Sequence, residues 1–295
     1  IQKCGNGEQR RRKSSMTNKY KYNSIITTFL KYFILCFIAF WVLLPLFSCL
    51  ITAFKNTEEY NTTSVMILPK VWEFSNFTRA FKLADMGRAF LNSLIVLVAV
   101  LAGSIIISSQ LAFVLNRFTF IGNSLIRKLF LFATLLPGVA MQVAVYKIMG
   151  SLHLINHLYG YIIMMMGTDV ITIYIFIQFM ENISVSLDES AIIDGASYFT
   201  IYWKIILPLL KPAIVTSLIL KGVSTYNEYY CANLYLQSKN LRTVAISLYT
   251  FTGPLGSQYN LICAGVIISM IPALIVFLFC QKQIYTGITA GAVKG

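Results

Sequence analysis

The sequence predicts an all-α, polytopic membrane protein with six transmembrane helices and both termini in the cytoplasm. Of its 295 residues, 57% are hydrophobic and 12% are charged, whereas soluble domains usually carry about 25% charged residues. The apolar residues fall in long runs, and about 20 such residues are enough to cross a bilayer as a helix. Lysine and arginine are concentrated just before the first run, as expected for a cytoplasmic end.

The apolar runs define the expected helices. The first extends from residue 32 to residue 53, and a helix of that length spans about 33 Å, enough for a hydrocarbon layer of about 30 Å. Three prolines, Pro45, Pro137 and Pro272, fall inside runs. Such prolines kink or interrupt membrane helices where neighbouring helices can satisfy the freed backbone groups. The five further runs cover residues 90–114, 127–149, 158–180, 212–236 and 260–281.

The N-terminal part differs in composition from the rest of the chain. Residues 1–28 are polar and basic, and we expect them to form a flexible cytoplasmic extension, with the transmembrane domain covering residues 29–295. Residues 1–15 are either such a tail or lie upstream of a true start at Met16. The segment 115–128, between the second and third helices, carries basic residues without an acid. This distribution supports cytoplasmic N- and C-termini.

Composition and motifs exclude several other classes. The net charge of +13 does not indicate nucleic-acid binding, because no platform of basic and aromatic residues lies outside the apolar runs. The six cysteines have no CxxC spacing, so neither zinc binding nor redox chemistry is supported. His153 and His157 have i, i+4 spacing but lie in a short loop with no acid nearby. We expect no metal site and no catalytic residues.

The segment Glu181–Lys211, between the fourth and fifth expected helices, is much longer than a usual helix connection. Acids near Leu187 favour a helix start, and Gly195 permits a turn that other residues resist. One interpretation is an amphipathic helix lying at the membrane surface. The other is a short helix docked to a cytoplasmic partner, with Gly195 setting the turn.

The spacing within this segment resembles the EAA motif of ABC importer permeases, E-A-A-x3-G-x9-I-x-L-P. Ser190 in place of the middle alanine is the one departure. This resemblance implies a type I ABC importer-like fold. The matching residues are Glu189, Ser190, Ala191, Gly195, Ile205, Leu207 and Pro208.

Four other places resemble the carbohydrate-uptake branch of these permeases. Residues 89–95, with Asn92-Ser93, are similar to the start of its second helix, and residues 111–122 to the segment that follows that helix. The triplet Tyr226-Asn227-Glu228 resembles W-N-E/D with tyrosine replacing tryptophan. The last residues, GITAGAVKG, are similar to the tail of maltose-type permeases.

The resemblance implies a permease subunit that imports a sugar or oligosaccharide by alternating access in a bacterial plasma membrane. Its implied partners are a second, different permease, two ATP-binding subunits, an external solute-binding protein and the lipid bilayer. The chain has no GxxxxGK[ST] loop to hold phosphates. We therefore expect it to bind no cofactor itself, with ATP and magnesium on the partner subunits.

The resemblance also assigns a role to the cytoplasmic segment. Its short helix is expected to sit in a cleft of the ATPase and to convert ATPase closure into movement of the membrane helices. The residues expected to form this coupling core are Glu189, Ser190, Ala191, Asp194, Gly195, Phe199, Ile205, Leu207 and Pro208.

Polar residues inside the apolar runs are candidates for the substrate path, because charged groups in membrane helices are costly and usually face a bundle interior or water. We expect Lys221 to pair with Glu228 or Asp169, and these groups either contact substrate or support packing. The candidates are Asp169, Lys221, Tyr226, Asn227 and Glu228.

On the outer side, the turn-rich stretch Gly253, Pro254, Leu255 and Gly256 is either a contact for the binding protein or an ordinary surface turn.

Two alternative functions remain. A permease of the same fold could carry a peptide, a polyamine or phosphate, although the tail and the long EAA variant favour a sugar. A polytopic membrane enzyme would need paired acids or an activated nucleophile, and the acids here are scattered.

Overall fold

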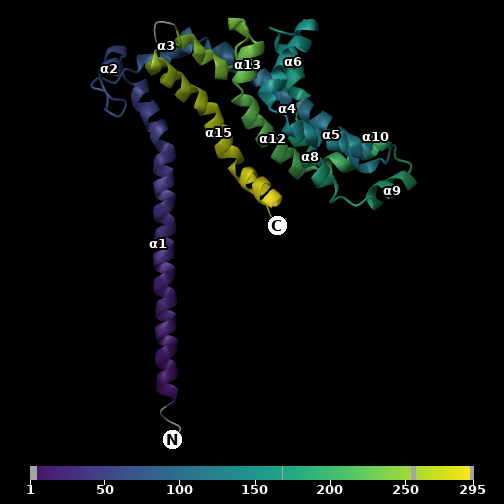
Figure 1. Ribbon diagram of the computed structural model, residues 1–295, viewed down its shortest axis with the longest axis horizontal. Helices are drawn as coiled ribbons and strands as arrows, with labels where there is room; N and C mark the ends of the chain where they lie inside the picture. Colours follow the sequence, from purple (N-terminus) through teal and green to yellow (C-terminus); the bar gives the residue numbers. More distant parts are fainter. Residues whose placement is uncertain (1–4, 168, 254–256, 293–295) are drawn as a thin grey trace. The chain divides into compact units, whose positions relative to one another are not determined.

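The computed structural model describes residues 5–167, 169–253 and 257–292, with side chains over 27–167, 169–253 and 257–281 (Figure 1). Over these residues the regular secondary structure is helical. The chain divides into two compact units, residues 1–74 and residues 75–295.

The first unit consists of a long helix and a small polar cap. Helix α1 runs from Gly5 to Ala53, and its part from Thr27 is long and apolar enough to cross a membrane. After it, Lys55 is fully buried and donates from Nζ to the carbonyl oxygen of Ser64 at 2.7 Å. Helix α2 (Thr57–Thr62) begins after Asn56, whose side chain accepts a hydrogen bond from a backbone N–H in the first turn. The boundary of the N-terminal extension at residue 28 stays a prediction.

The second unit contains two single membrane-length helices and three bent pairs. The single helices are α4 (Met86–Arg117) and α15 (Tyr259–Ala292), whose apolar part ends at Gln281. The bent pairs are α5 (Asn123–Leu135) with α6 (Gly138–Ser151), α7 (Leu158–Met166) with α8 (Val170–Met180), and residues 198–209 with α12 (Lys211–Tyr226). With α1, these make up to six spans when each pair counts as one, the number predicted.

The remaining elements are short. They are α3 (Ser75–Leu83), α9 (Ser186–Ile193), α10 (Tyr198–Ile201), a π-helix (Tyr202–Ile206), α11 (Leu207–Leu209), α13 (Tyr230–Tyr235), α14 (Val244–Ser247), and 3-10 turns at Lys239–Leu241 and Leu248–Phe251. Within the second unit, α9 and α10 lie at one end and α6 and α13 at the other (Figure 1).

Three predicted helices are wrong in extent. The run 158–180 is two helices, α7 and α8, which meet at 42°. The run 127–149 is two helices that meet at 109° around Pro137, because proline removes an N–H from the ladder and its ring obstructs the preceding turn. The run 212–236 ends at Tyr226. There the Glu228 side chain accepts from the backbone N–H of Cys231 at 2.9 Å and so starts the separate helix α13. By contrast, α15 continues through Pro272.

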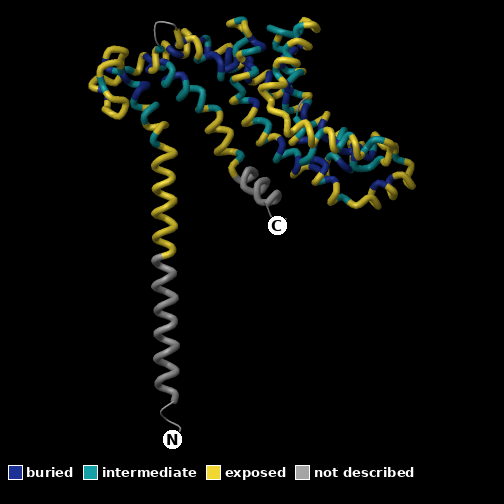
Figure 2. Tube along the Cα trace, viewed as in Figure 1, coloured by how far each residue is buried: buried dark blue, intermediate teal, exposed yellow. Residues whose placement is uncertain are grey.

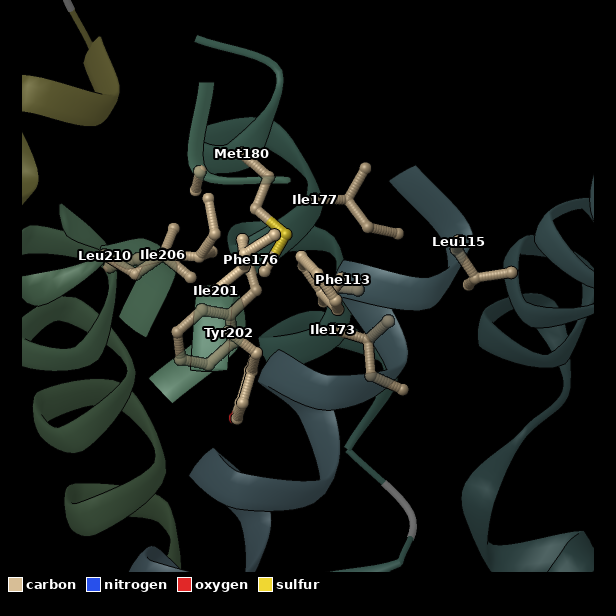
Figure 3. Close-up of a cluster of buried hydrophobic side chains, with 13 residues drawn as sticks. Phe113, Leu115, Ile173, Phe176, Ile177, Met180, Ile201, Tyr202, Ile206 and Leu210 are labelled. Atoms are coloured by element: carbon tan, nitrogen blue, oxygen red, sulfur yellow. The ribbon is translucent and has the colours of Figure 1, made fainter. Parts of the chain in front are cut away.

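Helices α4, α8 and α12 pack against one another and form the centre of the second unit. A buried cluster joins α4 and α8 to the segment before α12, and within it Phe113, Phe176, Ile201 and Tyr202 lie near one another (Figure 3). Phe176, Met180, Ile201, Ile206 and Leu210 in this cluster are fully buried. Figure 2 shows buried stretches in this central part, while α9 is mostly exposed. Residues 201–210, which precede α12, are therefore part of the core.

The close packing of α7 gives a test of this arrangement. A Cβ at Gly160 would collide with the backbone oxygen of Leu154, whereas a Cβ at Gly138 would meet nothing within 4 Å. Because a backbone atom cannot swing away, we expect Gly160→Ala to lower the stability by about 1–3 kcal/mol. Gly138→Ala is expected to be neutral. Thermal unfolding midpoints of the two purified variants in detergent check the prediction, and equal midpoints would contradict it.

Candidate functional site

The turn after α9 has the hydrogen bonds of a Schellman motif. Gly195 has a φ of 81° and donates its N–H to the carbonyl oxygen of Ile192 at 2.9 Å, and Ala196 donates to that of Ala191 at 2.9 Å. Both bonds close the helix end in the pattern that favours glycine at this place. A Cβ at Gly195 would meet nothing within 4 Å. The constraint on Gly195 is thus its backbone conformation, while the space beside it stays open.

Ser197 then starts α10, because its side chain accepts from the backbone N–H of Thr200 at 3.3 Å. Ser190, the departure from the EAA pattern, donates to the carbonyl oxygen of Ser186 one turn back at 2.8 Å. The serine is therefore satisfied within its own helix and needs no partner elsewhere.

The π-helix joins the cytoplasmic segment to α12. The N–H of Leu207 bonds to the carbonyl of Tyr202, one residue farther than in an α-helix. Pro208 follows directly, and a π-bulge accommodates a proline that would otherwise collide with the preceding turn. At the next break the chain bends by 71° into α12. Ile205 and Pro208 of the motif thus lie where the direction of the chain changes.

The inner face of this segment is packed on the protein. Ile201, Ile206 and Leu210 are fully buried in the cluster with α4 and α8, and the Tyr202 hydroxyl lies 2.7 Å from the Ser109 hydroxyl of α4. This packing disfavours a segment that only lies on the bilayer, while docking of the short helix to a partner stays a prediction.

A buried ion pair fastens α9 to the end of α4. Arg117 Nε lies 2.6 Å from Asp188 Oδ2, with side chains 5% and 8% exposed. The same guanidinium donates to the carbonyl oxygen of Ile183 at 3.0 Å. Burial raises the pKa of the Asp188 carboxyl, and the nearby guanidinium of Arg117 opposes this shift. The pair thus fixes both the start of α9 and the chain leading to it.

Sequence reasoning missed Asp188, which lies next to the motif. Arg117 was noted only as a basic residue in a segment without acids. The structure supplies the acid from the other cytoplasmic segment, and Arg127 likewise lies 3.8 Å from Glu181. The sequence did contain a signal for these pairings. Segment 115–128 has basic residues without an acid, and segment 181–211 is rich in acids.

The outer face of the segment is exposed and mixed in character. Glu189, Asp194 and Gly195 are exposed, and beside them Ile193 is 85% and Phe199 71% exposed. Ala191 of the motif instead faces the core. Because α9 lies outside the candidate spans, its exposed isoleucine is not explained by contact with lipid tails. An exposed apolar group rimmed by acids is typical of an interaction site, either for another protein or for a membrane surface.

The five residues predicted for the substrate path do not form one cluster of contacts. Lys221 Nζ lies 3.5 Å from Asp169 Oδ2, which is one of the two pairings expected. The Tyr226 hydroxyl donates to the carbonyl of Ser269 in α15 at 2.8 Å. Asn227 donates to the carbonyl oxygen of residue 223 in its own helix, and Glu228 starts α13 as described above. Contact of these residues with substrate stays a prediction.

On the outer side, Asn92 and Ser93 hold the segment that leads to the predicted binding-protein turn. The Asn92 amide donates to the carbonyl oxygens of Asn240 and Arg242 at 2.9 and 3.0 Å, and the Ser93 hydroxyl accepts from the N–H of Val244 at 2.9 Å. In the turn itself Gly253 is exposed. Pro254, Leu255 and Gly256 lie outside the described residues, so the turn stays a prediction.

Comparison with known proteins supports the resemblance found in the sequence. The family model of binding-protein-dependent transport system inner membrane components matches residues 16–289. The probable starch degradation products transport system permease protein AmyC of Thermoanaerobacterium thermosulfurigenes is 31% identical over 85% of this chain and 91% of its own length. The arabinooligosaccharides transport system permease protein AraQ of Bacillus subtilis is 30% identical over 86% of this chain and 91% of its own.

A third relative and a solved structure extend the comparison. The maltodextrin transport system permease protein MalD of Streptococcus pneumoniae is 27% identical over 95% of this chain and 100% of its own. A chain from the crystal structure of a bacterial ABC transporter involved in alginate import superposes with a TM-score of 0.75, at 23% identity, over 87% of this chain and 96% of that one. This likeness confirms the predicted fold.

The Arg117–Asp188 pair gives a second prediction. Removing one partner of a buried pair leaves the other charge uncompensated, which costs about 3–5 kcal/mol. We expect Asp188→Asn or Arg117→Gln to lower the thermal unfolding midpoint of the purified protein clearly. The control is Arg88→Gln, which breaks an exposed pair with Asp85 and should cost about 0–1 kcal/mol. Similar midpoints for all three variants would show that the buried pair does not hold the segment.

Proposed function

Because this chain belongs to the family of binding-protein-dependent transport system inner membrane components, we propose that the solute it carries is a sugar or an oligosaccharide. The chain is a multi-pass permease subunit of an importer. The names of three similar permeases refer to starch degradation products, arabinooligosaccharides and maltodextrin. These names support the proposed solute class over a peptide, a polyamine or phosphate.

The proposed assembly contains a second, different permease, two ATP-binding subunits and an external solute-binding protein, in a bacterial plasma membrane. The chain binds no cofactor, and ATP with magnesium is held by the ATP-binding subunits. The absence of a GxxxxGK[ST] loop from the sequence supports this division of labour. The N- and C-termini face the cytoplasm, in keeping with the basic residues of the first 31 positions and of segment 115–128.

One observation carries the coupling role. The segment from α9 to α11 is buried and ion-paired on its inner side, while Ile193 and Phe199 are exposed on its outer side. The exposed side enters a cleft of an ATP-binding subunit, and closure of the two ATP-binding subunits shifts α9. Because Ile201 and Ile206 are locked into the core with α4 and α8, the shift reaches the membrane helices and alternates access to the solute.

The outer segment has the complementary task. The stretch pinned by Asn92 and Ser93 presents Gly253 to the external binding protein. The triplet Tyr226-Asn227-Glu228 at the C-terminal end of α12 lines the path of the solute, whose hydroxyls require hydrogen bonds. Replacement of tryptophan by Tyr226 retains an aromatic face for stacking.

The coupling surface gives a third prediction, with a matched pair of variants. Ile193→Glu places a charge on the proposed ATPase contact, whereas Ile121→Glu changes an isoleucine that is 105% exposed on the neighbouring segment 115–128. Loss of a central apolar contact typically costs about 2 kcal/mol or more, which is more than tenfold in affinity. We expect Ile193→Glu to weaken binding of the ATP-binding subunit accordingly.

The first measurement is binding of a tagged ATP-binding subunit, by copurification and titration, to membranes that contain this chain and its partner permease. The second is uptake of a labelled maltodextrin, raffinose or arabino-oligosaccharide. Ile121→Glu should behave as wild type. Equal loss in both variants would assign the effect to general damage. Normal coupling with Ile193→Glu would refute the coupling surface, and transport of none of the sugars by an assembled wild-type complex would refute the solute class.

A further inference from the structure

Helix α12 turns a polar stripe toward the interior of the helix bundle. Ser217, Lys221 and Thr225 recur at intervals of four residues, which places them on one helix face. Ser217 is 1% and Thr225 6% exposed, and neither hydroxyl has a hydrogen-bond partner within the part of the chain that the structure describes. This face therefore holds α12 to its neighbours through few polar contacts.

Lys221, the central member of the stripe, does have a polar partner. Lys221 Nζ lies 3.5 Å from Asp169 Oδ2, with the two side chains 13% and 12% exposed. Asp169 is already oriented by its own helix, because it accepts from the Thr172 N–H at 3.3 Å and from the Thr172 hydroxyl at 2.6 Å. Within the described residues of α12, of α8 and of its N-cap Asp169, this ion pair is the one polar contact between the two helices.

A charged pair at this place requires an explanation. Asp169 lies between the two halves of one candidate span, and Lys221 lies inside another. Charges in membrane segments are costly and are found at functional positions. A well-packed apolar pair would generally stabilise the structure as well or better. Packing alone therefore does not account for the pair.

The position of the pair within the fold suggests its use. Helices α8 and α12 are the two arms that flank the coupling segment, and near that segment they are joined by Phe176, Leu210 and Ala213 of the buried cluster. Lys221 is eight residues farther along α12, or about 12 Å along the helix axis. The ion pair is thus a second contact between α8 and α12, separate from the buried cluster. Two separated contacts fix the relative orientation of the two helices.

We propose that Asp169 and Lys221 are a positioning pair that makes α8 and α12 move as one body when the coupling segment is displaced. The pair acts on the proposed ATPase-driven transport and so rests on that function. Without it, movement of α9 reaches α8 and α12 unequally, and ATP hydrolysis proceeds with less solute carried per turnover.

The experiment measures labelled sugar transported per ATP hydrolysed, with the complete complex in proteoliposomes. Lys221→Met should lower this ratio at least about fivefold, while Lys221→Arg should retain most of it. Asp85→Asn is the matched control, since it removes an exposed pair with Arg88 and should leave the ratio unchanged.

The ratio separates positioning from general damage. A variant that only misfolds reduces transport and hydrolysis together and leaves the ratio of the surviving complexes unchanged, so an unchanged ratio in Lys221→Met overturns the proposal.

A second measurement does not depend on the solute. Amide hydrogen exchange of the chain in lipid nanodiscs should be faster in Lys221→Met than in wild type at residues 170–172 and 222–226, and unchanged in α4. Equal exchange in the two proteins refutes the positioning pair even if the transported solute proves different. If wild type transports no sugar but exchange changes as expected, the proposed solute class fails and the pair stands.

Discussion

The rest of the structure depends on a constraint imposed by the bilayer, namely that backbone polar groups away from water must find partners within the protein. This chain interrupts three of its spans, so it frees such groups at several depths. Helix α4 supplies many of the partners. Near its start, Asn92 and Ser93 bind the backbone of residues 240–244. Farther along, Ser104 lies 3.4 Å from the last carbonyl oxygen of α7 and the Ser109 hydroxyl bonds to the hydroxyl of Tyr202. At its end, Arg117 donates to the backbone just before α9. A single unbroken helix thus supports the broken ones.

Features of this fold that depend on neighbouring residues can be predicted from the sequence, whereas features that depend on contacts between distant residues cannot. The apolar runs predict how many spans to expect, because hydropathy is a local property, and the EAA spacing predicts the turn at Gly195, because glycine is required at a positive φ. The bend at Pro137 and the end of α12 at Tyr226 were not predicted in their true form. A proline signals a disturbance without its angle, and the cap formed by Glu228 competes with an apolar run that continues past it.

The candidate site shows the same limit more sharply. The motif residues were identified by spacing, but the group that fastens them, Asp188, pairs with Arg117 across 70 intervening positions of the chain. Nothing in the local pattern distinguishes this acid from Glu189, which is exposed. Only the packing of α9 against the end of α4 decides which acid turns inward. The sequence predicts that Lys221 pairs with either Glu228 or Asp169. The packing of the helices determines that the partner is Asp169.

Exposure of apolar residues has different meanings in different parts of this molecule. Along the spans it is what lipid requires, whereas at Ile193, which lies outside the candidate spans, we propose that it forms a contact surface for a partner. The two sides of the cytoplasmic segment therefore differ in how firmly they are held. Fully burying a large aliphatic side chain is worth roughly 1.5–3 kcal/mol, and Ile201, Ile206 and Leu210 are all fully buried. Peeling the segment from the core would lose all three together with the Asp188 ion pair, so a force applied to α9 is transmitted to α4 and α8 before it can detach the segment.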